Sequence, residues 1–225
     1  MGSALILVDI QHDFMPWGAL PVPRGDEIVP VVNRLQAEFD TVVASQDWHP
    51  PNHLSFASNH REREPFEVTE VDGLEQILWP DHCVQGSEGA ELVPELETDR
   101  VDRIFRKGTD PRIDSYSAFH DNGHRKSTGL ADWLRERGVD TVYIAGLAED
   151  VCVYYTALDA VREGFGTHLV EDATHGVDMT PGDVARCLDD MREAGVRVTD
   201  SNAVLAECGA LPGAPDTDAP AGLRS

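Results

Sequence analysis

The sequence predicts an α/β protein with three layers, αβα, around a mostly parallel central sheet. Short runs of β-branched and apolar residues alternate with segments of helical periodicity, the order that parallel strands and crossover helices produce. The first run, Ala4–Val8, is continuously apolar, which is typical of a strand buried on both faces. No linker divides the 225 residues, which suffice for one sizeable core. We therefore expect a single domain over residues 1–210 and a disordered tail, residues 211–225, rich in Pro, Gly, Ala and Asp.

In the first half of the chain, the helix and strand signals are separated by long irregular stretches. The Pro- and Gly-rich segment Gln11–Arg24 is typical of a loop. Apolar residues at helical spacing then predict a helix over Asp26–Phe39, with Asp26 as its N-cap. A second strand is expected at Thr41–Ser45. The stretch Leu54–Asp102 is long and poorly periodic, which indicates a functional excursion within a compact domain.

The second half of the chain alternates more regularly. Strands are expected at Arg103–Lys107, Thr141–Ala145, Thr167–Val170 and Val196–Thr199. Helices are expected at Thr128–Arg137, in a segment with Cys152 in its first turn, and at Pro181–Ala194. A glycine that favours a helix end follows each helix: Gly138, Gly164 and Gly195.

Composition excludes several classes of partner. The chain carries 41 acidic against 18 basic side chains, a formal net charge of -23, which repels nucleic acid and anionic lipid. No apolar run approaches the roughly 18 residues that a membrane span needs, so we expect no membrane partner. The four cysteines, Cys83, Cys152, Cys187 and Cys208, include no C-x-x-C pair, and no signal-peptide pattern is visible. These features favour a cytoplasmic protein with free thiols.

Four reactive side chains follow four different predicted strands. Asp9, Asp47, Lys107 and Cys152 each lie at or just past a carboxyl end. Each also has an ordinary explanation: a turn-forming carboxylate, an exposed lysine, or a small residue that packs a helix start. However, the carboxyl ends of parallel strands share one edge of the sheet, where active sites form. Their convergence there favours a catalytic site.

Three of these residues suit covalent catalysis. A cysteine at a helix N-terminus sees the positive end of the helix dipole, which favours the thiolate. Asp9 supplies a proton acceptor, and Lys107 supplies a cation that lowers the pKa of the Cys152 thiol. The combination predicts hydrolysis of an amide or ester through a thioester.

The remaining candidates suit a metal ion and a flat ring. Asp47, His49 and His53 lie within seven residues on a proline-stiffened stretch, and His82 supplies a further imidazole. Two histidines and one carboxylate leave open positions for water or a substrate atom. Aromatic side chains that could wall a flat ring, or equally belong to the core, are Phe14, Trp79 and Tyr116.

Five segments resemble, in order, the motifs of the isochorismatase-like cysteine hydrolases, and among them the nicotinamidases. The segments are LVDIQHDF, SQDWHPPNHLSFASNH, WPDHCVQGSEGAEL, FRKGTDPRIDSYSAF and GLAEDVCVYYTALDA. The similarity extends over Leu5–Val204. It departs from the family's usual pattern at Met15-Pro16-Trp17-Gly18, at Glu149 and at Val151.

The resemblance implies a role for each candidate residue. The catalytic triad falls on Asp9, Lys107 and Cys152. The metal ligands fall on Asp47, His49 and His82, while the position of His53 is a ligand in some members and not in others. The backbone N–H groups of Ala148 and Cys152 would form the oxyanion hole, with a cis peptide between Leu147 and Ala148. Ring contacts fall on Phe14, Leu20, Trp79 and Tyr116.

The resemblance also implies an activity. It is the hydrolysis of nicotinamide, and also of pyrazinamide, to the acid and ammonia in NAD salvage, with one divalent metal ion: zinc, or else manganese or iron. The partner is then a small molecule, and both a monomer and a homo-oligomer are compatible with the sequence. Two alternatives stay open: a metal-free amidase of the superfamily that cleaves N-carbamoyl compounds, and a non-catalytic, metal-stabilised α/β module.

Overall fold

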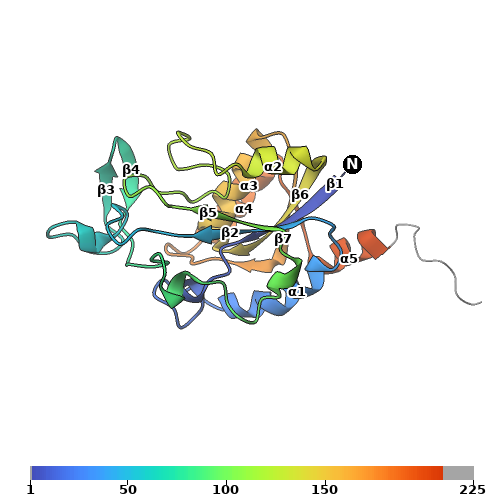
Figure 1. The fold of residues 1–225 in the computed structure, drawn as a ribbon, viewed down its shortest axis with the longest axis horizontal. Coiled ribbons are helices and arrows are strands. Elements are labelled where there is room, and N and C mark those ends of the chain that lie inside the picture. Colours follow the sequence, from blue (N-terminus) through green and yellow to red (C-terminus); the bar gives the residue numbers. More distant parts are fainter. Residues whose placement is uncertain (1, 210–225) are drawn as a thin grey trace, which may run out of the picture.

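A six-stranded, entirely parallel sheet forms the centre of the computed structural model, which describes residues 2–209 (Figure 1). The strand order is β5-β2-β1-β6-β7-β8. The strands are β1 (Gly2–Val8), β2 (Val42–Asp47), β5 (Arg103–Lys107), β6 (Val139–Leu147), β7 (Gly166–His175) and β8 (Arg197–Thr199). The expected parallel sheet is confirmed, and the apolar run of β1 lies at its centre, covered on both faces.

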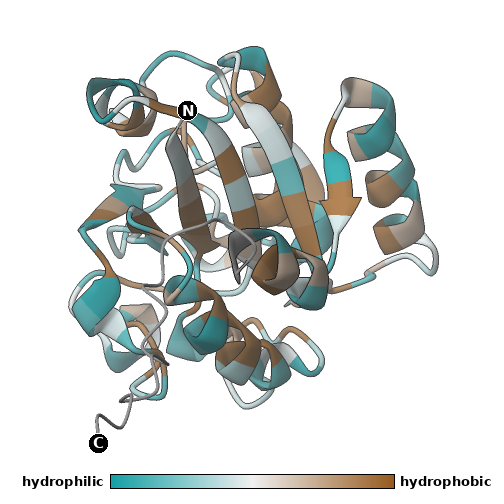
Figure 2. Cartoon of the chain, turned by 90° about the vertical axis from the view of Figure 1, so that its right-hand side faces the viewer, coloured by the Kyte–Doolittle hydropathy of each residue, from teal (hydrophilic) through white to brown (hydrophobic). Residues whose placement is uncertain are grey.

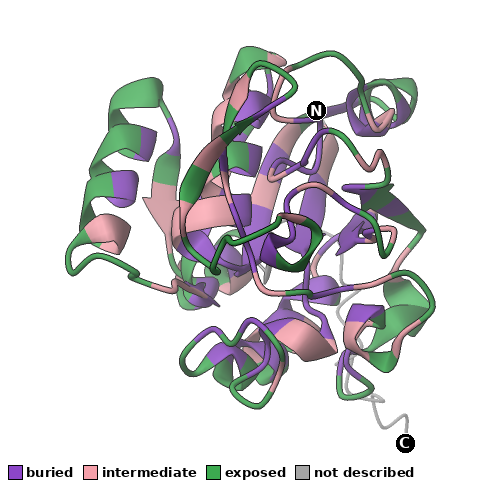
Figure 3. Cartoon of the chain, turned by 90° about the vertical axis from the view of Figure 1, so that its left-hand side faces the viewer, coloured by how far each residue is buried: buried purple, intermediate pink, exposed green. Residues whose placement is uncertain are grey.

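Helices cover both faces of the sheet. They are α1 (Val29–Gln36), α2 (Leu130–Glu136), α3 (Tyr154–Arg162), α4 (Asp183–Ala194) and α5 (Ser201–Gly209). Helices α1 and α5 pack on one face, and α2, α3 and α4 pack on the other. Hydrophobic and buried residues concentrate on the strands and on the inward sides of these helices (Figures 2 and 3). The predicted three-layer architecture is therefore confirmed.

The strand order reverses between β1 and β6. The chain moves from β1 outward to β2 and β5, then returns to the other side of β1 with β6 and continues outward. Ligands of parallel α/β sheets bind at such a switch point, beyond the carboxyl ends of the two central strands. Asp9 follows β1 directly, and Cys152 lies five residues past the end of β6.

Several elements differ from the sequence-based expectation, among them β7, which extends to His175 instead of ending at Val170. The helix expected over Asp26–Phe39 is a 3₁₀ turn, Gly25–Ile28, followed by α1, so Asp26 is not its N-cap. Pro30 explains the late start, because proline is tolerated only in the first turn of a helix. The stretch Leu54–Asp102 contains an antiparallel hairpin of β3 (Val68–Val71) and β4 (Leu74–Ile77), and α5 was not expected.

No helix within residues 2–209 is long and apolar enough to cross a membrane. The single domain over residues 1–210 stays a prediction, and the tail expected at residues 211–225 lies outside the described residues.

Candidate active site

The four reactive side chains that the sequence singled out lie together at the carboxyl edge of four neighbouring strands. Asp47 and Lys107 are the last residues of β2 and β5, and Asp9 follows β1. Cys152 lies in a π-helical turn, Glu149–Val153, between β6 and α3. All four side chains are buried.

Lys107 is at the centre of this cluster. Its Nζ lies 2.9 Å from Asp9 Oδ2 and 2.8 Å from Asp47 Oδ1, and it donates to the Ser115 carbonyl at 2.9 Å. Cys152 Sγ is 3.5 Å away. Burial by itself would lower the pKa of Lys107, but the carboxylates of Asp47 and Asp9 more than offset it and raise the pKa well above its ordinary value. Lys107 is therefore a buried cation.

Asp9 is placed to exchange a proton with Cys152. Its backbone is left-handed (φ 49°), and its Oδ1 accepts the Ser45 hydroxyl at 2.7 Å. A carboxylate oxygen of Asp9 lies within 4.8 Å of Cys152 Sγ. Burial raises the pKa of Asp9, although Lys107 opposes the change.

The pKa of Cys152 differs from the expectation. The helix start and Lys107 were expected to favour the thiolate, but burial raises the pKa of Cys152 well above its ordinary value, and Lys107 only partly opposes this. Burial therefore favours the thiol over the thiolate, so attack by this sulfur would need a base to take the proton. Asp9 is the carboxylate in reach.

Asp47, His49 and His82 form a donor set that fits a divalent metal ion. Their donor atoms all lie within 4.8 Å of one another. The Nδ1 atoms of His49 and His82 contact backbone carbonyls of Gly108 and Pro80 at 3.0 and 2.8 Å, so each Nδ1 carries the proton and each Nε2 keeps a free lone pair. These Nε2 atoms lie 3.4 and 3.7 Å from Asp47 Oδ2.

The buried Nε2 of His49 has no hydrogen-bond partner, as expected for an atom that binds a metal ion. Gln11 supports the set, because its side chain bonds both the N–H and the carbonyl of Asp47 at 2.8 Å. The residues present therefore fit a metal ion.

His53 adjoins this set but presents a different ring nitrogen. With His49 and Asp114 it forms a second group of close donors. However, its Nδ1 accepts the backbone N–H of Ser55 at 3.1 Å, so in the neutral ring Nε2 carries the proton. Burial, followed by His49, lowers the pKa of His53 to about 4, which keeps the ring neutral. The buried Nε2 of His53 has no hydrogen-bond partner either, but a protonated Nε2 has no free lone pair for a metal ion.

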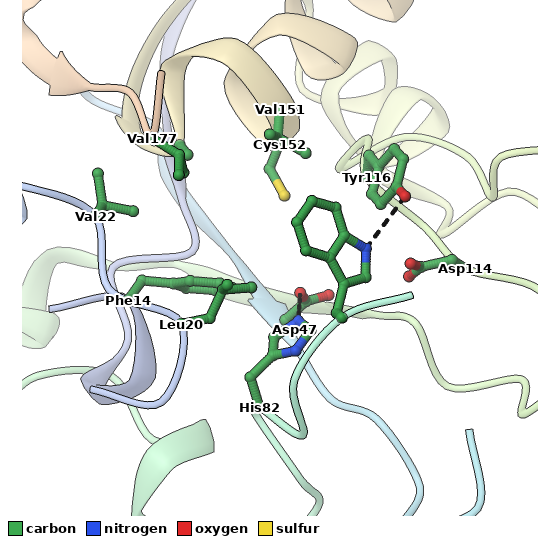
Figure 4. Close-up of a pocket in the computed structure, with 12 residues that line it drawn as sticks. Phe14, Leu20, Val22, Asp47, His82, Asp114, Tyr116, Val151, Cys152 and Val177 are labelled. Atoms are coloured by element: carbon green, nitrogen blue, oxygen red, sulfur yellow. Dashed lines mark hydrogen bonds and ion pairs between the residues drawn. The ribbon is translucent and has the colours of Figure 1, made fainter. Parts of the chain in front are cut away.

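A cavity with mostly apolar walls lies beside Cys152 (Figure 4). All four residues expected to contact a ring line it: Phe14, Leu20, Trp79 and Tyr116. The Trp79 indole donates to the Tyr116 hydroxyl at 3.2 Å, and Gln76 of β4 contacts the same hydroxyl at 3.2 Å. Asp47 and His82 reach the cavity from the metal-ligand set.

The sequence missed four residues of the cavity wall: Val22, Asp114, Val151 and Val177. Val22 and Val177 are single valines, which no sequence pattern distinguishes from core residues, whereas Val151 was noted only as a departure from the family's usual pattern. Asp114 lies in a loop away from any strand end, so the argument from strand ends could not find it.

The proposed oxyanion residues also face this cavity. Ala148 and Cys152 both line it, and the Leu147–Ala148 peptide is cis, as the resemblance implied. The carbonyl of Ala148 accepts the N–H groups of Val151 and Val153 at 3.0 Å, which begins the turn that carries Cys152.

The parallel sheet with its edge site of thiol, carboxylate and buried ammonium group defines an α/β enzyme with a cysteine at its centre. The chain belongs to the isochorismatase family, whose domain matches residues 3–203.

Several relatives of this family are similar over nearly the whole chain. The nicotinamidase of Escherichia coli K12 is 50% identical over 196 residues, 85% of this chain and 92% of that protein. A solved structure of an Acinetobacter baumannii nicotinamidase/pyrazinamidase has a TM-score of 0.88 at 47% identity, covering 90% of this chain and 98% of that chain. A pyrazinamidase of Pyrococcus horikoshii, solved in complex with zinc, has a TM-score of 0.72 at 41% identity and covers 89% and 99%. This level of identity indicates an amidohydrolase.

Proposed function

We propose that this enzyme hydrolyses nicotinamide to nicotinate and ammonia through a thioester on Cys152. One observation carries the proposal: the metal-ligand set and the cysteine face the same small apolar cavity, so a ring and its carboxamide can be held by different parts of one site. The similarity to nicotinamidases over most of the chain supports the same substrate. Pyrazinamide is proposed as a second substrate, because like nicotinamide it has a ring nitrogen meta to the carboxamide carbon, which the same metal position could hold.

In the proposed mechanism, Asp9 takes the proton of the Cys152 thiol as sulfur attacks the carboxamide carbon. The oxyanion is stabilised by the N–H groups of Ala148 and Cys152. Asp9 then returns the proton to the leaving nitrogen, and ammonia departs as the thioester forms. Water next attacks the thioester, Asp9 accepts one of its protons and passes it to the departing Cys152 sulfur, and the acid leaves as nicotinate after losing its remaining proton to solvent. Lys107 stays protonated throughout and neutralises the buried carboxylates.

Asp47, His49 and His82 would hold a divalent ion, which we propose to be zinc. When bound, it would supply an electrophilic position for a ring nitrogen of the substrate. The walls formed by Phe14, Leu20, Trp79 and Tyr116 then orient the ring. We place the activity in NAD salvage in the cytoplasm, where the free thiols of Cys83, Cys152 and Cys187 would stay reduced.

An ammonia-release assay on purified protein tests the proposal. Nicotinamide and pyrazinamide should release ammonia, while N-carbamoyl amino acids should not, because they lack the ring that the metal site and the aromatic walls would hold. Preferred cleavage of an N-carbamoyl compound would favour the metal-free amidase alternative. No ammonia from any amide would favour a binding module.

The substitution Cys152→Ala tests the nucleophile. We expect turnover to fall to the background rate while thermal stability stays close to that of the wild type, because the change removes one buried sulfur. Rapidly quenched wild-type enzyme should carry an acyl adduct on Cys152 by mass spectrometry. Cys187→Ala, which changes another buried cysteine outside the cavity, is the matched control and should stay active. Activity in Cys152→Ala would contradict the assignment.

A further inference from the structure

Asp150 joins the turn that carries Cys152 to a separate part of the cavity wall. It is the second residue of the π-helical turn Glu149–Val153. Its Oδ1 accepts the backbone N–H of Val177 at 2.9 Å, and its Oδ2 accepts that of Asp178 at 2.7 Å. Bonds from two backbone N–H groups to one carboxylate are charge-assisted and restrict both residues at once. The mechanism described above does not use this carboxylate.

The segment held in this way contributes directly to the cavity. Val177 lines it, on the same side as Val151 and Cys152 and across from Phe14 and Leu20 (Figure 4). Strand β7 ends at His175, so the sheet ladder does not extend to Val177. Beyond the strand, the backbone N–H of this wall residue is bound by the side chain of Asp150.

The local sequence is adapted to this contact. A Cβ added to Gly176 would lie 3.0 Å from Asp150 Oδ1 and 2.3 Å from Val184 Cγ2, so a side chain at this position would crowd both groups. Further along, Asp178 Oδ1 accepts the Gly182 N–H at 3.0 Å, which closes the segment into a compact turn before α4. Residues 176–182 thus form one unit that Asp150 holds against the turn of Cys152.

We propose that Asp150 is a positioning residue that, through Val177, sets the size of the ring that the cavity accepts. The inference rests on the proposed function for its choice of substrates. When both N–H groups are bound, Val177 stays pressed towards the ring. When one bond is lost, the wall moves outward, contact with a small ring weakens, and a larger ring fits.

The test compares Asp150→Asn with wild type, using nicotinamide and nicotinamides that carry one methyl group on the ring. Asparagine keeps one acceptor but turns an NH₂ group towards the second N–H. We expect KM for nicotinamide to rise about tenfold with kcat changed less than about threefold, the result of lost ground-state binding. Selectivity for nicotinamide over the bulkier methyl derivatives should fall by a similar factor. Val177→Ala should reproduce the loss of selectivity.

Asp172→Asn is the matched control. Asp172 also binds a backbone N–H with its carboxylate, that of Ser201 at 2.7 Å, but it joins β7 to α5 and does not line the cavity. It should alter stability as Asp150→Asn does and leave KM and selectivity unchanged.

Hydrogen exchange at the amides of Val177 and Asp178 supplies a readout that needs no turnover. Exchange should be faster in Asp150→Asn than in wild type, and unchanged in α3. Unchanged exchange, unchanged KM, or an equal loss of kcat for every amide would overturn the positioning role. By contrast, wild-type enzyme that releases no ammonia from nicotinamide would overturn the proposed function, while the exchange result would still decide whether Asp150 holds the wall.

Discussion

The environment of Lys107 could not be predicted from its neighbours in the sequence. As one lysine before a glycine, it would ordinarily be an exposed side chain. Its burial between two carboxylates became predictable only because β1, β2 and β5 were expected to end at one edge. The pKa of Cys152 was not predictable in this way, because the helix start is a local feature whereas burial depends on the whole fold.

Glu149 should make the free energy of unfolding depend on pH. It is buried, and its Oε1 has no hydrogen-bond partner. Burial raises its pKa from 4.5 to about 7, and Glu171 and Asp150 add to the effect, against a hydrogen bond from Thr174. A raised pKa in the folded state means that unfolding releases a proton between these pH values. Its contribution to stability is therefore fully present below pH 4.5 and is lost as the pH rises to about 7.

Glu149→Gln should remove this dependence. The difference in the free energy of unfolding between variant and wild type should grow by at most about 1.4 kcal/mol per pH unit and level off above neutral pH. Urea denaturation at a series of pH values measures it. Glu136→Gln, at an exposed position of α2, is the control and should give a parallel curve to wild type. A parallel curve for Glu149→Gln as well would show that the pKa of Glu149 does not differ between the folded and unfolded states.

At the scale of elements, the alternation of strands and helices was predictable because each has a strong periodic signal. The hairpin β3–β4 was missed, although Asp72-Gly73, a residue pair typical of two-residue hairpin turns, joins its strands with positive φ at both positions. The helix α5, Ser201–Gly209, was missed because it follows β8 almost directly and has no clear amphipathic pattern. Its signal was Asp200, whose side chain accepts the Ala203 N–H as an N-cap does.

Gly146 allows the two central strands, β1 and β6, to pair closely. It lies in β6 with φ 127°, and a Cβ there would lie 2.1 Å from the carbonyl oxygen of Val8 in β1. Gly146→Ala should push these strands apart, lower the free energy of unfolding by about 3 kcal/mol, and reduce kcat/KM further by separating Asp9 from Cys152.

Urea denaturation and steady-state kinetics test Gly146→Ala. The matched control is Gly166→Ala at the start of β7, where the nearest atom, a Thr141 side-chain oxygen, would be 3.3 Å away. It should change stability by less than about 1 kcal/mol. A fully active and stable Gly146→Ala variant would mean that the two strands tolerate a wider separation.

At the scale of the whole molecule, the fold class and the sheet edge that carries the site were both predictable from the sequence. Alternating strands and helices imply a parallel sheet, and ligands of such sheets bind beyond the carboxyl ends of the strands. The formal net charge of -23 acts at the same scale. A negative field attracts divalent cations and disfavours bound anions. In the proposed reaction a neutral amide enters and an anionic acid leaves, so the field assists product release.

Removal of the metal ion should change the stability of the whole molecule. A ligand that binds only the folded state raises stability, by about 4 kcal/mol at a thousand times its Kd. Chelation should therefore lower Tm and raise KM for nicotinamide, and zinc, manganese or iron should restore both. Benzamide, which has no ring nitrogen, should stay a poor substrate in either form.

Two variants separate the ligands in the same melting experiment. His49→Ala should abolish the rise in Tm on zinc addition, whereas His53→Ala should retain it, because the Nε2 of His53 carries a proton. Full activity of the chelated enzyme on nicotinamide, or equal rates with benzamide, would reduce the metal to a structural role.

The reversal of strand order between β1 and β6 determines when the active site can assemble during synthesis and folding. Asp9 emerges early from the ribosome, whereas Cys152 follows only after β2, the hairpin and β5 have been made. Until β6 inserts beside β1, the base has no nucleophile and the nascent chain is inert. Contacts between such distant segments form slowly. The recovery of enzymatic activity during refolding should therefore report the pairing of β6 with β1. It should lag behind any signal that reports helix formation alone.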